Sequence, residues 1–119
     1  MTSIGIDIVE IERVESAIKQ WGERFLNRIY TEAELKNEKH RVLSLATRFA
    51  AKEAVMKVLG TGTKGVAWRE IEILADDNGK PLVKLYGQAL NKAAELNLKE
   101  FSISLSDSKQ HAVAVAIGI

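Results

Sequence analysis

The chain has 119 residues, the size of one domain, and a domain of this size buries roughly two-thirds of the surface that its unfolded chain exposes. Its 17 basic and 16 acidic residues leave a formal net charge of +1, so the overall charge gives no indication of a nucleic-acid partner. It contains no cysteine, which excludes disulfides, thiolate catalysis and zinc–thiolate sites and fits a reducing cytoplasm.

The N-terminal segment predicts a strand and shows no targeting signal. It has neither the basic nor the long apolar region of a signal peptide, and no apolar run approaches the roughly 20 residues of a membrane span. Side chains of residues 3–9 alternate between two faces, one with Ile4, Ile6 and Ile8 and the other with Gly5, Asp7 and Val9. Asp7 therefore interrupts what otherwise reads as a buried strand. We expect a single cytoplasmic domain over residues 1–119, with no nucleic-acid or membrane partner.

Helical segments are expected to follow this strand. A helix over about 11–21 has apolar residues at helical spacing and ends at Gly22, and residues 23–30 are also expected to be helical. Thr31-Glu32-Ala33-Glu34 is a capping-box pattern that predicts a short helix at 32–39. A long helix should span about 41–59 and stop at Gly60.

The C-terminal half predicts two hairpins. Strands at about 69–75 and 81–86 are joined by Asp76-Asp77-Asn78-Gly79, a hairpin signal. A helix at 87–97 precedes a second hairpin, 100–106 and 111–118. The order β-α-α-α-β-β-α-β-β favours an α+β fold with a largely antiparallel sheet packed against the long helix.

The long helix carries a second carboxylate among apolar residues. At about 100° per residue, Glu53 and Lys57 fall on an apolar side of the helix. A basic stripe, expected to be solvated or to face an anion, lies nearly opposite and consists of Arg41, Arg48 and Lys52. Glu53 and Lys57 also stand at i and i+4, the spacing of a common solvated ion pair, so a purely structural pair is the alternative to a functional one.

Asp7 and Glu53 together predict a divalent metal site. Burial of an ionised carboxylate is costly unless a cation or hydrogen bonds compensate it, and two such groups on separate elements suggest a shared cation. Oxygen ligands without cysteine favour Mg²⁺, which takes one or two carboxylates and completes its shell with water and phosphate oxygens. With Lys57 nearby, the pair describes a phosphate-handling site. The alternative is a structural Asp7 that caps the following helix, although Glu10 is better placed for that role.

The segment Gly60-Thr61-Gly62-Thr63-Lys64-Gly65 matches the letters of a dinucleotide-binding fingerprint. That fingerprint needs a strand before it and a helix after it, and here the order is reversed. We interpret the segment as a flexible connection from helix to strand, whose amides could still touch a phosphate.

Three segments together resemble the signature of holo-acyl-carrier-protein synthases, the small bacterial phosphopantetheinyl transferases. They are Gly5-Ile6-Asp7-Ile8, Arg48-Phe49-Ala50-Ala51-Lys52-Glu53-Ala54 with Lys57, and Gly60-Thr61-Gly62. Length, element order, Asn78-Gly79-Lys80-Pro81 and Ile103-Ser104-Leu105-Ser106 match as well, so the resemblance covers nearly the whole chain. It implies the 4′-phosphopantetheinyl transferase fold and Mg²⁺-dependent transfer of 4′-phosphopantetheine from coenzyme A to a serine of apo-acyl carrier protein, releasing adenosine 3′,5′-bisphosphate.

The resemblance also implies roles for individual residues. Asp7 and Glu53 match the family's Mg²⁺ ligands, and Lys57 matches a lysine near the pyrophosphate. The serine needs a base, and our candidate is Glu53, acting directly or through a metal-bound water. Contacts to coenzyme A are expected from Arg48, Lys57, Gly60, Asn78, Gly79, Lys80, Pro81 and Ser106. Contacts to the acidic carrier protein are expected from Arg13, Arg24 and Arg28, for which a solvated amphipathic helix is the alternative.

One position departs from the family's pattern. Many relatives carry His after the Ser of the closing strand, whereas this chain has Ser106-Asp107. His111 is a candidate replacement, and a surface or packing role is its alternative. The family is typically homotrimeric with active sites between subunits, so the resemblance implies a homotrimer.

Two other functions compete with this interpretation. Phosphopantetheinyl transferases of secondary metabolism tend to be about twice this length, so the chain has the wrong size for that class. A non-catalytic module that binds an acidic helix through its arginines would leave Asp7 and Glu53 unexplained.

Overall fold

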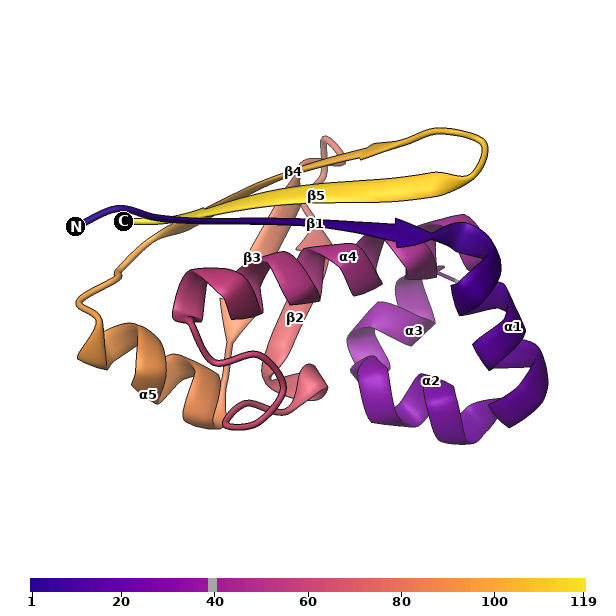
Figure 1. The fold of residues 1–119 in the computed structure, drawn as a ribbon, viewed down its shortest axis with the longest axis horizontal. Helices are drawn as coiled ribbons and strands as arrows, with labels where there is room; N and C mark the ends of the chain where they lie inside the picture. The colour runs from indigo at the N-terminus through magenta and orange to yellow at the C-terminus, as the bar shows by residue number, and fades with distance from the viewer. Residues whose placement is uncertain (39–40) are drawn as a thin grey trace.

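Two antiparallel sheets and one long helix form the framework of the fold (Figure 1). The computed structural model describes residues 1–38 and 41–119. Its elements are β1 (Ser3–Glu10), α1 (Ile11–Trp21), α2 (Glu23–Ile29), α3 (Glu32–Glu38), α4 (Val42–Leu59), the 3₁₀ helix η1 (Trp68–Glu70), β2 (Ile71–Ala75), β3 (Pro81–Leu85), α5 (Gly87–Glu95), β4 (Phe101–Asp107) and β5 (His111–Gly118).

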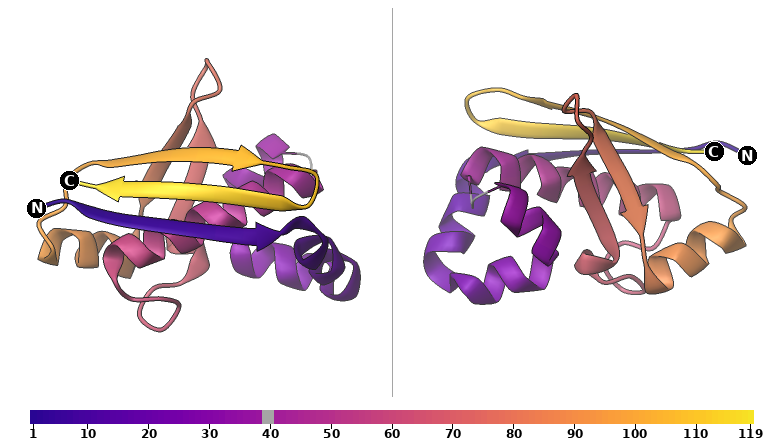
Figure 2. Two further views of the ribbon diagram at one scale, coloured as in Figure 1. Left: turned by 45° about the horizontal axis from the view of Figure 1, so that its top comes forward. Right: turned by 180° about the vertical axis from the view of Figure 1, so that it is seen from behind.

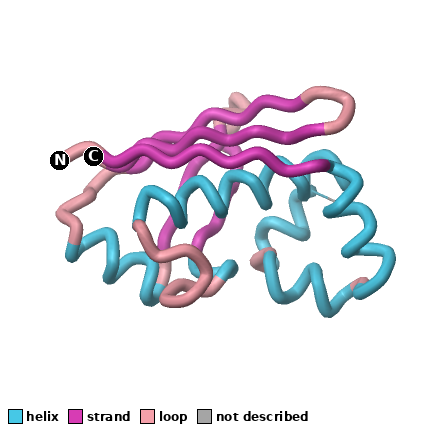
Figure 3. The backbone as a smooth tube through the Cα atoms, in the orientation of Figure 1, coloured by secondary structure: helices cyan, strands magenta, loops and turns pink. Residues whose placement is uncertain are grey.

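The long helix α4 lies between the two sheets. The larger sheet has the order β1-β5-β4, and β1 and β5 pack on α4. The hairpin β2–β3 lies on the other side of α4, with α1, α2 and α3 at one end of that helix and α5 at the other (Figure 2). The two chain termini lie side by side at one end of the larger sheet (Figure 3). The α+β class with antiparallel sheets is confirmed.

Small residues let the larger sheet approach α4 closely. Ala112, Ala114 and Ala116 of β5 are fully buried against the helix. A Cβ atom on Gly5 of β1 would collide with the main-chain oxygen of Ala54. Glycine at this position is therefore required by close packing, because β1 rests directly on the backbone of α4.

The other face of the larger sheet is open. Ile4, Ile6 and Ile8 of β1 are 65%, 57% and 62% exposed, although a buried strand was expected. They stand opposite Ile117, Val115 and Val113 of β5, which are partly exposed on the same face. The expectation that this face is buried is wrong for the single chain: the side of β1 that carries Gly5 and Asp7 packs on α4, and the isoleucines point away.

The local signals for turns and helix starts are confirmed. In the capping box, Thr31 N donates to Glu34 Oε1 at 2.8 Å and Glu34 N donates to Thr31 Oγ1 at 3.2 Å. In the β2–β3 turn, Asp76 Oδ1 accepts hydrogen bonds from the main-chain N–H groups of Asn78 and Lys80 at 2.8 and 2.9 Å. These side-chain bonds to the main chain explain why short motifs located the elements well.

Three details differ from the expected elements. Four α-helices precede β2, whereas the expected element order counted three; the helical segment expected at residues 23–30 is a separate helix, α2. Residues 68–70 form η1, so β2 begins at Ile71 rather than near residue 69. The expected end of the short helix at residue 39 lies outside the described residues. Among the residues that the structure describes, no helix is both long and apolar enough to cross a membrane.

Candidate active site

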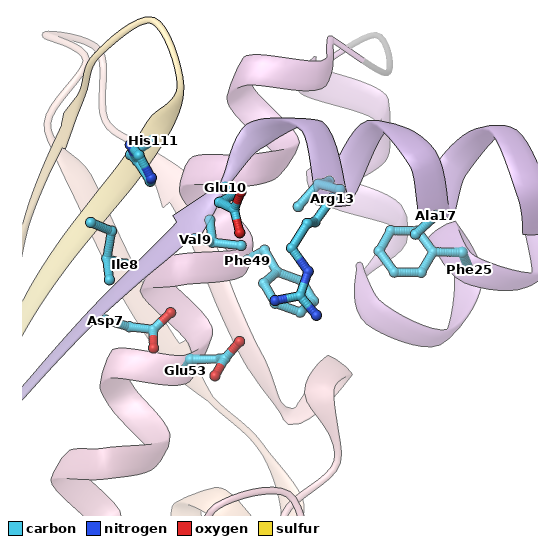
Figure 4. A pocket seen from close by; sticks show the side chains of 11 residues that line it. Asp7, Ile8, Val9, Glu10, Arg13, Ala17, Phe25, Phe49, Glu53 and His111 are labelled. Carbon is cyan, nitrogen blue, oxygen red and sulfur yellow. The ribbon is translucent and has the colours of Figure 1, made fainter.

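Asp7 of β1 and Glu53 of α4 line the same cavity, which has a volume of about 570 Å³ (Figure 4). Their proximity follows from the packing of β1 on α4. Gly5 and Asp7 share one face of the strand, and Ala54 is the neighbour of Glu53 in the helix. The contact between Gly5 and Ala54 therefore brings the two carboxylates together, although 46 positions separate them along the chain (53 − 7).

Both carboxyl groups are in surroundings that disfavour their charged forms. Burial raises the pKa of Asp7, and the nearby Lys57 ammonium offsets part of that rise. Burial also raises the pKa of Glu53; the charge of Asp7 raises it further, whereas Lys57 and Arg13 lower it. A cation bound between the carboxylates would relieve both the lost hydration and the mutual repulsion.

One carboxylate oxygen of Asp7 is available to bind a cation. Asp7 Oδ2 is buried and accepts no hydrogen bond from any described residue. Within residues 1–38 and 41–119, we find no group of three or more His, Cys, Asp or Glu side chains that could hold a metal ion. Two carboxylates suit Mg²⁺, which takes most of its remaining ligands from water and phosphate, better than a metal held by a full protein cage. The residues present therefore fit the predicted Mg²⁺ ion.

Lys57 provides a cation at the edge of this pair. Its Nζ donates to the main-chain oxygen of Ile6 at 2.8 Å and lies 3.4 Å from Asp7 Oδ1. The Lys57 side chain is 56% exposed, whereas that of Asp7 is 11% exposed. The ammonium is thus held beside the carboxylates and remains open to an anion from solvent.

The rest of the cavity combines an apolar wall with two basic side chains and the acidic side chain of Glu10. Its apolar lining consists of Ile8, Val9, Val14, Ala17, Phe25 and Phe49. Arg13 extends from α1 over the cavity, and His111 lies near Ile8 at the start of β5 (Figure 4). Phe49 stands one helical turn before Glu53, so a helical wheel could locate it, but no sequence signal placed Phe25 here.

The stripe on α4 was expected to be solvated or to face an anion, and solvation is wrong for two of its three members, which are buried. Lys52 is fully buried and forms an ion pair with Glu34 at 2.8 Å. Arg48 is 8% exposed, and its Nε donates to the main-chain oxygen of Ile73 at 3.0 Å. Only Arg41 is exposed as expected. The burial of Arg48 against β2 also argues against its predicted contact with coenzyme A.

Most other residues predicted to contact coenzyme A lie away from the carboxylates. Gly60 ends α4 in the left-handed conformation, with a φ of 72°. The turn at residues 78–81 projects beyond the β4 edge of the larger sheet, whereas Asp7 is on β1 at the opposite edge (Figure 2). Ser106 is exposed and pairs with Val113, which places it on the open face of the sheet. One chain alone does not bring these residues to the cavity, and their roles stay predictions.

The three arginines predicted to bind a carrier protein are divided between two helices. Arg13 of α1 lines the cavity. Arg24 and Arg28 are exposed on α2, and the guanidinium carbon of Arg24 lies 5.9 Å from the ring centre of Trp21. The basic side chains therefore extend from the cavity along the surface of α1 and α2.

Comparison with known proteins gives one consistent result. The sequence model of the 4′-phosphopantetheinyl transferase superfamily matches residues 3–116. A holo-[acyl-carrier-protein] synthase of Dehalococcoides mccartyi is 50% identical over 117 residues, covering 98% of each chain. One from Herpetosiphon aurantiacus is 45% identical over 126 residues, covering 100% of this chain and 99% of the relative. The crystal structure of Helicobacter pylori holo-[acyl-carrier-protein] synthase in complex with coenzyme A has a TM-score of 0.89 at 33% identity, covering 98% of this chain and 99% of the other. This chain therefore belongs to the holo-[acyl-carrier-protein] synthases of the 4′-phosphopantetheinyl transferase superfamily.

Proposed function

We propose that this protein transfers 4′-phosphopantetheine from coenzyme A to a serine of an apo-acyl carrier protein, with Mg²⁺, and releases adenosine 3′,5′-bisphosphate. The observation that carries the proposal is the meeting of Asp7 and Glu53 in one cavity, with Asp7 Oδ2 buried and unpaired among the described residues. The coenzyme A complex of the Helicobacter pylori relative supports the donor substrate. Coenzyme A as donor and a chain without cysteine support a cytoplasmic location.

The side chains around the cavity would divide the work of this reaction. Asp7 and Glu53 would hold Mg²⁺, which when bound supplies positive charge to the pyrophosphate. The half-exposed ammonium of Lys57 would neutralise the phosphate oxygens that gain charge as the P–O bond breaks. Glu53 is our candidate to accept the proton of the serine hydroxyl, either directly at a carboxylate oxygen or through a water molecule.

The carrier protein would approach over α1 and α2. Arg13 reaches into the cavity, and Arg24 and Arg28 are exposed on the neighbouring helix. An acidic partner would be steered by these charges, so its association rate should fall as the salt concentration rises. The apolar wall beside Phe25 and Phe49 offers contact area close to the reacting groups.

We further propose that the active protein is a homotrimer with sites shared between subunits. The exposed isoleucines of β1 form an apolar face of the kind that marks interaction sites. The turn at residues 78–81 is remote from Asp7 within one chain, so a neighbour would have to bring it to the cavity. Mixing inactive Glu53→Gln with an inactive Lys80→Ala variant should then restore part of the activity, because mixed trimers contain some intact sites. A monomer that is active at the wild-type rate would refute this arrangement.

One experiment tests the reaction itself. The protein is incubated with coenzyme A, Mg²⁺ and apo-acyl carrier protein, and the intact mass of the carrier is measured. We expect the mass to rise by one phosphopantetheine group, to stay unchanged with a chelator, and to stay unchanged with Glu53→Gln. Glu95→Gln, on the exposed surface of α5, is the matched control and should behave as wild type. Binding of the carrier without any gain in mass would favour the non-catalytic module instead.

A further inference from the structure

The side of α4 that faces β2 holds charged groups that the proposed reaction does not use. Arg48 and Lys52 stand one turn apart on this side, and both are buried. Twelve of the 18 residues of α4 are buried, and they surround the helix rather than forming one stripe. Because no single apolar stripe sets the rotation of such a helix about its axis, close contacts such as that of Gly5 with Ala54 and directed polar bonds must give it a preference for one rotation. The buried charged groups can provide that preference.

These charged groups complete the hydrogen bonds of an open strand edge. Among the described residues β2 pairs only with β3, so main-chain groups on its other edge need different partners. Arg48 Nε donates to the oxygen of Ile73 at 3.0 Å, and Lys52 Nζ donates to the oxygen of Ile71. The carboxylate of Glu34 accepts a hydrogen bond from Ile73 N at 2.9 Å. Side chains from α3 and α4 therefore occupy the place of a further strand.

Glu34 links this edge to α3 as well. Its Oε1 accepts hydrogen bonds from Lys52 Nζ and from Thr31 N, both at 2.8 Å. The side chains of Lys52 and Glu34 are both 0% exposed. A buried ion pair can often be replaced by apolar residues without loss of stability, so stability alone is a weak reason for its presence. Its several directed bonds instead define one position of α4 relative to α3 and β2.

We propose that the Lys52–Glu34 ion pair positions Glu53 for the reaction by fixing the rotation of α4. Lys52 and Glu53 are adjacent, about 100° apart around the helix, so holding Lys52 on β2 determines where Glu53 points. Without metal, the carboxylates of Asp7 and Glu53 repel one another, and a small rotation of α4 would separate them. The ion pair resists that rotation from the far side of the helix. Lys52 touches no reacting group and acts as a positioning residue.

The test compares variants that loosen this contact with a variant that weakens the same helix elsewhere. Lys52→Met/Glu34→Met removes both charges of the ion pair together, but it also leaves the main-chain oxygen of Ile71 and the main-chain N–H of Ile73 without these partners. Glu34→Gln is the milder change. Val58→Ala, a buried residue of α4, is the control for general loss of stability. We expect the Mg²⁺ concentration for half-maximal transfer to rise at least about tenfold in the double variant and by less in Glu34→Gln, and to stay within about twofold in Val58→Ala.

A second measurement uses the metal-free protein and does not depend on activity. Glu53→Gln should raise the melting temperature of wild type, because it removes the repulsion with Asp7. In the background of the double variant, the rise in melting temperature caused by Glu53→Gln should shrink by about half or more. If the double variant does not fold, Glu34→Gln is used as the background instead. The Val58→Ala background should keep the full gain. An unchanged gain and an unchanged Mg²⁺ requirement in a folded variant would overturn the proposal. Since this inference rests on the proposed function for its catalytic part, absence of transfer by wild type would refute that function, while the melting experiment would still decide the positioning.

Discussion

Replacing Gly5 by alanine should separate the two carboxylates and destabilise the fold. The new Cβ would collide with the main-chain oxygen of Ala54 and lie 3.0 Å from Cβ of Lys57. Neither atom belongs to a flexible side-chain end, so β1 has to move away from α4. Overpacking of this kind costs about 1–3 kcal/mol. Asp7, two residues further along the same face, would move away from Glu53 with the strand.

The expected change in melting temperature follows from the size of the chain. With an unfolding entropy of about 2.1 cal/mol/K per residue, a chain of 119 residues loses roughly 4 °C for each kcal/mol. Gly5→Ala should therefore melt about 4–12 °C below wild type in thermal unfolding followed by circular dichroism. It should also need more Mg²⁺ for half-maximal transfer.

Gly65→Ala is the matched control for this change. A Cβ on Gly65 would meet nothing within 4 Å, and its backbone is not left-handed. Alanine there should be neutral or slightly stabilising, because it reduces the entropy of the unfolded chain. If Gly5→Ala melted within about one degree of Gly65→Ala and kept its Mg²⁺ requirement, the close contact of β1 with α4 would not be what brings the carboxylates together.

Three further predictions concern charge, a buried hydrogen bond and assembly. Without metal, the pKa of Asp7 lies above its ordinary value of 3.8 and that of Glu53 above its ordinary value of 4.5. The folded protein therefore binds these protons more tightly than the unfolded chain does. The resulting stability is present at low pH and is lost as the pH rises through the raised pKa values. Glu53→Gln should therefore gain stability over wild type as pH rises from about 4 towards 7, measured by melting with a chelator, and a constant difference would contradict these shifts. Tyr30→Phe removes the 2.6 Å hydrogen bond to the oxygen of Leu45 and should cost about 1–3 kcal/mol in urea unfolding, with the transfer rate unchanged. Ile6→Glu, on the open face of β1, should yield monomers by light scattering, and a variant that stays trimeric would place the interface elsewhere.

The sequence located the two carboxylates because each one breaks an apolar pattern. Asp7 interrupts an alternating strand, and Glu53 interrupts an apolar helix. A charged group at such a position has a high cost in free energy, so its presence suggests a compensating partner. The same reasoning did not identify the cavity's apolar wall, because Phe25 is an ordinary apolar residue whose place depends on how α2 packs.

The basic residues of α4 show where a helical wheel is insufficient. The wheel correctly placed Arg48 and Lys52 together and away from Glu53, but it could not show what faces them. Their partners include the main-chain oxygens of Ile71 and Ile73, and an edge that lacks a strand becomes apparent only once β2 is placed. A basic stripe on a helix is usually solvated, and here an open strand edge replaces the solvent.

The alternation of side chains along β1 likewise could not predict which face of the strand is buried. The period of two separates the isoleucines from Gly5 and Asp7, but it does not indicate which face meets α4. Hydrophobicity favours burying the isoleucines, and the structure instead buries the face with glycine. Close approach to the helix decides the outcome within one chain, because a face of small side chains lets the two backbones touch. The isoleucines are then available to contact another subunit, and their exposure therefore supports assembly into an oligomer.

Two sets of cations hold α4 from opposite sides, and this arrangement explains how a repulsive pair can be maintained. Lys57 donates to the main-chain oxygen of Ile6 on β1, whereas Arg48 and Lys52 donate to main-chain oxygens of β2. The helix is thus bonded to both sheets, and Glu53 lies between the two sets of contacts. Mutual repulsion of the carboxylates acts to rotate or lift this helix, and main-chain oxygens fixed in two separate sheets resist both movements. The framework can therefore keep Asp7 and Glu53 close before any cation is bound, so that binding does not have to reorganise the site.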